Sequence, residues 1–245
     1  ALAPLYACKR LFVQRRAAKA LTPEEAGLVN GEMLLQMLPI PSDNLEVMEL
    51  SFAKVVTGWM EKEAEHKSLL ELAARYGAWA LYSEQGKEKH SAGLLFKQPK
   101  KLDPEHLVAV KTELRDGIVI KRLPKEHLRA RDGFALTDDG GHLKHALDSA
   151  HYCIFCHNQG KDSCSKGLKE KDGSYKKNSL EITLAGCPLE EKISEMNLLK
   201  SKGVPVGALA MVVVDNPMCA GTGHRICNDC MKSCIYQKQE PVNIP

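Results

Sequence analysis

The sequence predicts a mainly α-helical protein, with a helical region over residues 1–140 and a cysteine-dense domain over residues 141–245. Helix-start signals and apolar residues at helical spacing recur through the first 150 residues. Eight of the nine cysteines lie between Cys153 and Cys234. Hydrophobic residues make up 44% of the 245, enough for a packed core, which excludes a largely disordered or fibrous chain.

The first expected helix begins at Thr22, which is followed by Pro23, Glu24 and Glu25. Thr22 can accept from the backbone amide three residues on, Pro23 suits the first helical position, and Glu25 can reach back to the cap. We expect this helix to continue to about Leu38, because two prolines follow there and cannot extend it.

Two longer helices are expected next. The first begins near Ser42 and Asp43, and its apolar residues recur at helical spacing: Leu45, Met48, Phe52, Val55, Val56 and Trp59. Ser68 is expected to cap the second. Its apolar face comprises Leu69, Leu72, Ala73, Tyr76 and Ala80. Both tryptophans, Trp59 and Trp79, are expected in the core.

The remaining elements are shorter. Asp103, Pro104 and Glu105 repeat the cap-then-proline signal, so we expect a fourth helix after them. Residues 118–120, which follow an Asp-Gly pair, are the best candidate for a strand. The turn-rich stretch 137–141 marks the domain boundary. A short amphipathic helix from Leu143 then leads into the first cysteine pair.

The first 140 residues show no catalytic motif: no Gly-rich phosphate loop, no nucleophile elbow and no paired histidines at metal-binding spacing. Their histidines are scattered among charged residues. Surface positions are therefore expected for His66, His90, His106 and His127.

Charge and hydropathy limit the partners. The formal net charge is only +3, which argues against nucleic-acid binding. The longest apolar run, Val204 to Val214, is too short to cross a bilayer as a helix, so no transmembrane segment is expected. No signal peptide is visible, and we expect a cytoplasmic protein. The missing initiator Met and the abrupt ending suggest a piece of a longer chain.

The cysteines follow a spacing typical of metal ligands. They read Cys153-x2-Cys156-x7-Cys164, then Cys187-Pro188 and Cys219, and finally Cys227-x2-Cys230-x3-Cys234. A C-x2-C pair places two thiolates around one tight turn, so that both can reach one ion or cluster. Soft thiolate ligands select zinc, copper(I) or iron–sulfur clusters.

Several interpretations compete. Two [4Fe–4S] clusters need about eight ligands, and a Cys-Pro step recurs in such ligand runs. Structural zinc usually shows two pairs about 12–20 residues apart, whereas these pairs are more widely separated. Residues 153–157 match the haem motif C-x-x-C-H, which leaves the other cysteines unexplained and requires export. Disulfides are disfavoured without a secretory signal. We favour iron–sulfur clusters.

A family resemblance supports this choice. From about Leu143 to Pro245 the chain resembles the N-terminal iron–sulfur domain of the small subunit of glutamate synthase, also found in dihydropyrimidine dehydrogenase and related FAD-dependent pyridine nucleotide oxidoreductases. The matching segments, in order, are residues 147–156, 186–189, 215–217, 224–227, 230–234 and 241–244. The resemblance implies an alpha-helical ferredoxin-like fold that binds two [4Fe–4S] clusters, and it leaves the first 140 residues unexplained.

The resemblance also implies which cysteines are ligands. One cluster would be held by Cys153, Cys156, Cys164 and Cys234. Three corners of the other would be held by Cys187, Cys227 and Cys230. Its fourth ligand would be a Gln or Glu beyond Pro245, or Cys219, which we favour as a bystander thiol. The sequence departs from the family in the insert 165–186, expected to be a surface loop, and in wider or narrower cysteine spacings.

The expected function is an electron-transfer module. The resemblance implies that FAD and NAD(P)H bind in a following domain of the same polypeptide, and that a partner subunit or site accepts the electrons. No complete dinucleotide fingerprint or active site lies in this chain. The chain is therefore expected to be a fragment of an NAD(P)H-dependent oxidoreductase that does not turn over alone. A zinc-stabilised protein-interaction module is the alternative.

Overall fold

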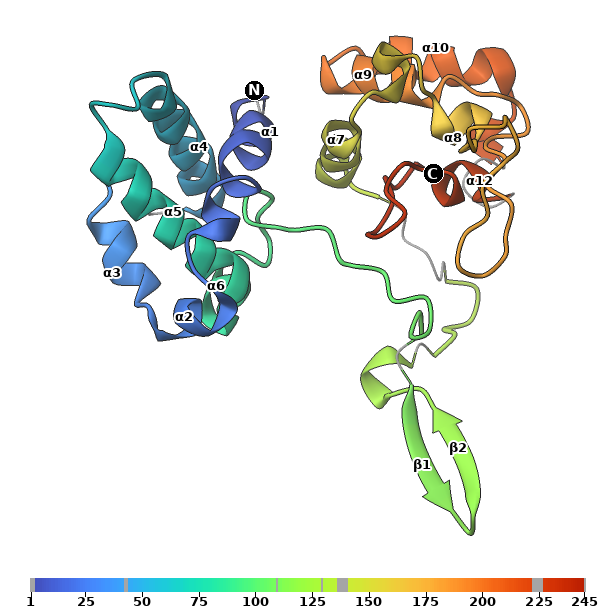
Figure 1. Cartoon of the computed structure of the whole chain (residues 1–245), viewed down its shortest axis with the longest axis horizontal. Helices are drawn as coiled ribbons and strands as arrows, with labels where there is room; N and C mark the ends of the chain where they lie inside the picture. The colour runs from blue at the N-terminus through green and yellow to red at the C-terminus, as the bar shows by residue number, and fades with distance from the viewer. Residues whose placement is uncertain are drawn as a thin grey trace. The chain divides into compact units, whose positions relative to one another are not determined.

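The computed structural model describes residues 3–41, 44–108, 110–128, 130–135, 141–221 and 227–244. The chain divides into two compact units, Ala1–Pro99 and Lys100–Pro245 (Figure 1). The prediction of a mainly α-helical protein is confirmed. The boundary expected at residues 137–141 falls almost wholly on residues 136–140, outside the described residues, and it stays a prediction.

The first unit is built from helices around an aromatic core. In chain order they are α1 (Ala3–Cys8), the π-helical turn η1 (Lys9–Val13), the 3-10 turn η2 (Ala17–Lys19), α2 (Pro23–Leu28), α3 (Gly31–Gln36), α4 (Leu45–Glu61), α5 (Lys67–Tyr82) and α6 (Glu84–Lys89). The buried aromatic residues are Tyr6, Phe12, Phe52, Trp59, Tyr76, Trp79 and Phe96. The core positions predicted for Trp59 and Trp79 are thus confirmed.

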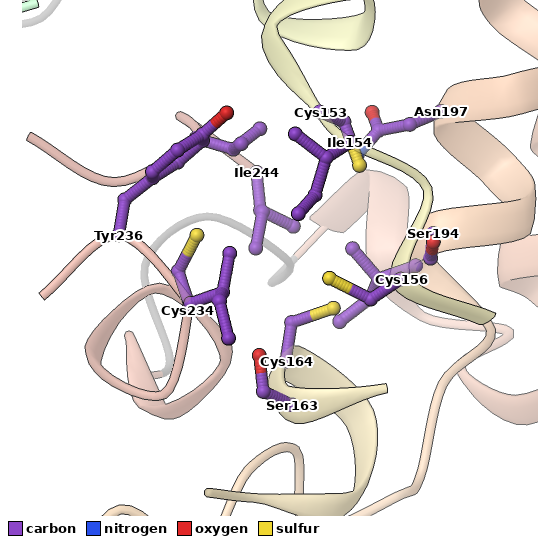
Figure 2. Close-up of a pocket in the computed structure, with 13 residues that line it drawn as sticks. Cys153, Ile154, Cys156, Ser163, Cys164, Ser194, Asn197, Cys234, Tyr236 and Ile244 are labelled. Carbon is purple, nitrogen blue, oxygen red and sulfur yellow. The ribbon is translucent and has the colours of Figure 1, made fainter. Parts of the chain in front are cut away.

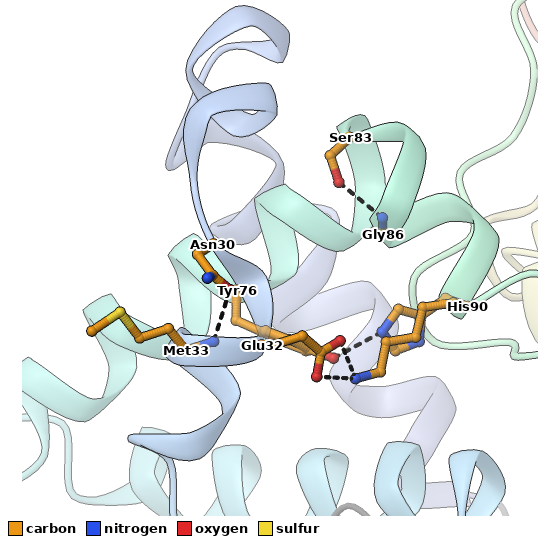
Figure 3. Close-up of polar contacts among 8 residues, drawn as sticks. Asn30, Glu32, Met33, Tyr76, Ser83, Gly86 and His90 are labelled. Atoms are coloured by element: carbon orange, nitrogen blue, oxygen red, sulfur yellow. Dashed lines mark hydrogen bonds and ion pairs between the residues drawn. The ribbon is translucent and has the colours of Figure 1, made fainter.

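The expected helix from Thr22 to Leu38 is two helices. Its start is confirmed, because Thr22 and Glu25 form the predicted capping box. However, α2 ends at Leu28, and Asn30 caps α3 by accepting from the Met33 N–H at 3.1 Å (Figure 3). Gly31 lies against Trp79, where an added Cβ would meet the indole at 2.0 Å. The chain thus passes close to the Trp79 ring at the point where the expected helix is interrupted.

The two long helices were predicted better at their centres than at their starts. On the predicted apolar face of α4, Leu45 and Val55 are half-buried, whereas the other four residues are buried as expected: Met48, Phe52, Val56 and Trp59. Its predicted start at Ser42 and Asp43 lies outside the described residues, and Asn44 caps the helix by accepting from the Glu46 N–H at 2.9 Å. Ser68 was wrongly predicted as a cap, since α5 begins at Lys67 and Ser68 lies in its first turn.

A buried polar network joins α4 to the chain after α6. Glu49 is only 2% exposed, and its carboxylate accepts from the Leu94 and Leu95 N–H groups at 2.8 and 3.0 Å. The other carboxylate oxygen lies 2.9 Å from His90 Nδ1. His90 Nε2 lies 2.9 Å from the Tyr76 hydroxyl (Figure 3). The surface position predicted for His90 is wrong, because polar partners on both ring nitrogens allow its burial.

The second unit begins with a hairpin. The strands β1 (Lys111–Arg115) and β2 (Ile118–Arg122) pair antiparallel across Asp116 and Gly117, both with positive φ, as a type I′ turn requires. The predicted strand at 118–120 is confirmed, whereas its partner was not foreseen. The helix predicted after Asp103 is wrong. The Asp103 carboxylate accepts from the Glu105 N–H at 3.1 Å, and the chain forms a single turn there instead of a helix.

The cysteines lie among short helices. These are α7 (Leu143–Tyr152), the 3-10 turn η4 (Cys156–Gln159), α8 (Ser163–Lys166), α9 (Ile193–Ser201), α10 (Pro205–Asp215) and α12 (Asp229–Lys232), with a further 3-10 turn, η3 (Lys125–His127), after the hairpin. The helix predicted from Leu143 is confirmed as α7. In the part of the chain that the structure describes, no helix combines the length and apolarity needed to cross a membrane.

Candidate metal centre

Four cysteines from three separate segments line one pocket. Cys153 follows α7, Cys156 opens η4, Cys164 lies in α8, and Cys234 follows α12. Figure 2 shows Cys234 across the space from the other three. All four of these cysteines are buried. The structure thus brings together the four cysteines that the family resemblance assigns to one cluster.

The first pair is set by a strained turn. Phe155, between the two cysteines, has φ +54°, a left-handed conformation that is uncommon for a bulky residue. The chain that continues from α7 turns at Phe155, and η4 begins at the next residue, Cys156. The Phe155 N–H donates to Cys153 Sγ at 3.4 Å. The backbone therefore supplies both the bend and a hydrogen bond to sulfur.

The rest of the pocket is mainly apolar. Its aliphatic lining comprises Ile154, Ile193, Ile235, Val242 and Ile244. Tyr152 and Tyr236 stack beside it with ring centroids 4.5 Å apart, and the Tyr236 hydroxyl donates to the Tyr152 carbonyl at 3.2 Å. These contacts hold the segment after Cys234 against α7. Residues 241–244, the last of the segments that match the family, have no regular secondary structure.

Burial favours the protonated thiols of Cys153, Cys156 and Cys164 in the metal-free chain. Burial raises the pKa of Cys156 to about 11, with smaller contributions from Cys153 and Cys234. It also raises the pKa of Cys164, next to the Asp162 carboxylate. Thiolates gathered here need a compensating positive charge, and a metal group would provide it.

One side of the pocket is polar. Helix α9 contributes Ser194 and Asn197 to the lining, and both are buried. Ser194 Oγ lies 2.6 Å from His157 Nδ1, so His157 has a polar partner of its own. Burial raises the pKa of Cys153, while the Asn197 and Ser194 side chains act in the opposite direction by favouring its thiolate. No sequence motif singles out these two residues, although they follow Cys187-Pro188 on one helix face.

The insert 165–186 closes on itself beside Cys164. The Cys187 N–H donates to the Cys164 carbonyl at 2.9 Å, and the Gly186 N–H donates to Ser233 Oγ at 2.9 Å. Further along, the backbone bridges Lys169 with Tyr175 and Lys177 with Thr183. The first and last residues of this long excursion are therefore neighbours. Cys187 is held next to Cys164 in spite of their separation in sequence.

A second group surrounds Cys230. The pKa of Cys230 is raised to about 12, chiefly by burial, with smaller contributions from Cys187, Cys227 and Glu191. Cys227 is exposed. Residues 222–226, just before it, lie outside the described residues, and they include most of the segment 224–227 that matches the family. The structure thus places Cys187 and Cys227 near Cys230, and it reveals Glu191 as a carboxylate that the sequence argument missed.

Cys219 stands apart from the other three thiols of this group. Burial raises its pKa, as does Glu191, with no contribution from another cysteine. Cys8 is buried in the first unit. Within the described ranges, no three His, Cys, Asp or Glu side chains are placed so that they could hold one metal ion. The sulfurs of the four pocket cysteines border an open space and do not converge on the position of one ion.

The close packing at the base of the insert gives a testable prediction. Gly186 has φ +85°, and an added Cβ would lie 2.4 Å from the Gly167 nitrogen, whereas Gly173, with φ +89°, has open space there. Alanine at either position costs about 1–2 kcal/mol for its conformation. Only Gly186→Ala adds a clash. We expect Cys164 in the metal-free chain to be alkylated several-fold faster in Gly186→Ala than in Gly173→Ala, measured by mass spectrometry. Equal rates would show that the insert base does not shield Cys164.

The fold and the site define a mainly α-helical protein with a buried four-cysteine pocket. The chain belongs to the family of the uncharacterized protein RP005 of Rickettsia prowazekii (strain Madrid E), to which it is 32% identical over 214 residues, covering 81% of this chain and 68% of that protein. It is also 82% identical over 28 residues to the uncharacterized protein RP006 of the same organism, covering 11% of this chain and 4% of that protein. No family model and no solved structure matches.

Proposed function

We propose that this chain is an electron-transfer module that holds two [4Fe–4S] clusters. The observation that carries the proposal is the convergence of four cysteines from distant segments on one apolar pocket. The donor set fits the group, because soft thiolates are the ligands that iron–sulfur clusters use. In this proposal the domain is alpha-helical ferredoxin-like and related to the N-terminal domain of the glutamate synthase small subunit.

The pocket residues have separate tasks in this proposal. Cys153, Cys156, Cys164 and Cys234 hold the first cluster as thiolates. The aliphatic side chains around them exclude water, and the stacked tyrosines fix the last ligand segment against α7. When bound, such a cluster takes up and releases single electrons at a potential set by charge, hydrogen bonds and solvent exposure.

The second group would hold the other cluster. Cys187, Cys227 and Cys230 supply three thiolates, and the fourth ligand is either Cys219 or a residue beyond Pro245. The hydrogen bond from the Cys187 N–H to the Cys164 carbonyl links a ligand of one cluster to a ligand of the other. Electrons would pass between FAD, reduced by NAD(P)H in a following domain, and a partner site. Neither FAD nor NAD(P)H is assigned a binding residue in this chain.

Metal analysis tests the proposal. The chain purified without oxygen should be brown, absorb broadly near about 400 nm with bleaching on reduction, and carry about eight irons with matching sulfide. Occupancy of the four-cysteine pocket alone would give about four irons and would remove the second cluster from the proposal. A colourless protein with stoichiometric zinc would replace it with a zinc-stabilised interaction module.

A further inference from the structure

Helix α9 carries two of the polar residues of the pocket, and Ser163 of α8 is a third. Ile193, Ser194 and Asn197 of α9 all line the space, and the last two are 0% and 5% exposed. Their spacing places them along one side of the helix. In Figure 2, Ser194 and Asn197 come from the same helix, on the side of the space where Cys153 and Cys156 lie. Besides Ser163 of α8, the polar side chains in this otherwise aliphatic lining come from α9.

The Asn197 amide is the unusual member of this pair. Its Nδ2 is buried, and no hydrogen-bond partner is present for it in the described part of the chain. Buried donors without partners are rare in folded proteins and call for a physical explanation. Asn197 and Cys153 both line the pocket and lie next to each other in Figure 2, yet no hydrogen bond joins them. The donor is therefore directed at the pocket without an acceptor.

Ser194 is placed differently. Its oxygen lies 2.6 Å from His157 Nδ1 and 3.5 Å from the His157 backbone nitrogen, whose N–H it accepts. When His157 carries its proton on Nδ1, the Ser194 oxygen accepts both hydrogen bonds from His157. The hydrogen of the Ser194 hydroxyl is then available to the Cys153 sulfur. Ser194 thus has His157 as a hydrogen-bond partner, whereas Asn197 Nδ2 has no hydrogen-bond partner in the described part of the chain.

We propose that Asn197 sets the reduction potential of the cluster held by Cys153, Cys156, Cys164 and Cys234, by donating an N–H hydrogen bond to sulfur at the Cys153 corner. This inference rests on the proposed function and adds a residue to it. Reduction adds one electron, taken from a reduced flavin in the enzyme or from dithionite in vitro, and neither makes nor breaks a covalent bond. The added negative charge strengthens the N–H···S bond, so the amide favours the reduced state and raises the potential.

The test compares Asn197→Leu with the same substitution at Asn158. Asn158 is exposed in η4, two residues from Cys156, and does not line the pocket. In the full chain, Asn197→Leu should keep its iron and shift the one-electron reduction equilibrium about fivefold toward the oxidised state, which is about 40 mV at 59 mV per tenfold. Asn158→Leu should leave the potential unchanged. The potentials are read from an EPR redox titration, in which the pocket signal is the one lost in Cys234→Ala.

A second variant covers a failure to fold. Asn197→Asp has the same size but no N–H, and it should lower the potential at least as much. Wild-type potential in Asn197→Leu or Asn197→Asp, with iron retained, would overturn the inference and leave the proposed function standing. Loss of iron from both variants would also overturn it, because Asn197 would then serve folding alone. Absence of iron from the wild-type chain would instead remove the proposed function.

Discussion

Replacing Cys234 with alanine is expected to halve the iron content, from about eight to about four per chain, and to abolish the cluster at Cys153. The physical reason is the position of Cys234 across the pocket from Cys153, Cys156 and Cys164. Its sequence neighbour Cys230 belongs to the other group. Iron and sulfide analysis together with EPR of the reduced protein measures the effect.

Cys219→Ala is the matched control for this variant. Cys219 is a half-buried thiol of the second unit, and it does not line the pocket. We expect it to keep all of its iron. If Cys234→Ala kept the cluster at Cys153 and lost the one at Cys230, the assignment of ligands to clusters would be wrong. Loss of half the iron in Cys219→Ala would make Cys219 the fourth ligand of the second group.

Glu49→Ala is expected to destabilise the first unit by about 3–5 kcal/mol, the cost of removing one partner from a buried charged network. The carboxylate accepts from two backbone N–H groups and contacts His90, and all three lose their partner in this variant. Both tryptophans of the chain lie in this unit, so their fluorescence during urea unfolding reports on it alone.

Lys54→Ala on the same helix serves as the control. Lys54 is exposed on α4, and surface substitutions usually change stability by less than about 0.5 kcal/mol. An effect of Glu49→Ala below about 1 kcal/mol would mean that water replaces the carboxylate and that the network does not hold α4 in place. Both variants place alanine in α4, so the difference between their free energies of unfolding reports on the burial of Glu49 and not on helix propensity.

Local sequence signals predicted local structure well. The capping box at Thr22 and the apolar spacing of α4 each depend on residues within one or two turns, and both are found. Errors arose where distant contacts decide. Trp79 lies against Gly31, at the point where the first helix breaks. Asp103 carries a helix-start signal but closes a single turn, because the signal does not determine whether the following residues stay helical.

His90 and the polar residues of α9 illustrate the same limit. His90 is buried because Glu49, 41 residues away, and Tyr76 satisfy its ring. Nothing adjacent to His90 in sequence indicates these partners. Ser194 and Asn197 were missed because their neighbours, Cys153 and His157, lie some 40 residues earlier. For the cysteines, spacing indicated metal chemistry, and their grouping came from the family resemblance. Whether the two groups hold clusters stays a prediction.

The backbone hydrogen bond between Cys187 and Cys164 has a consequence for how this protein tolerates change in length. Because the chain leaves and returns at one point, residues between the two cysteines can be gained or lost with little effect on the sulfur positions. The entropy of closing a longer excursion grows only slowly with its length. The turn at Gly173, which has open space around it, is accordingly a place where a reporter peptide can be introduced close to the pocket.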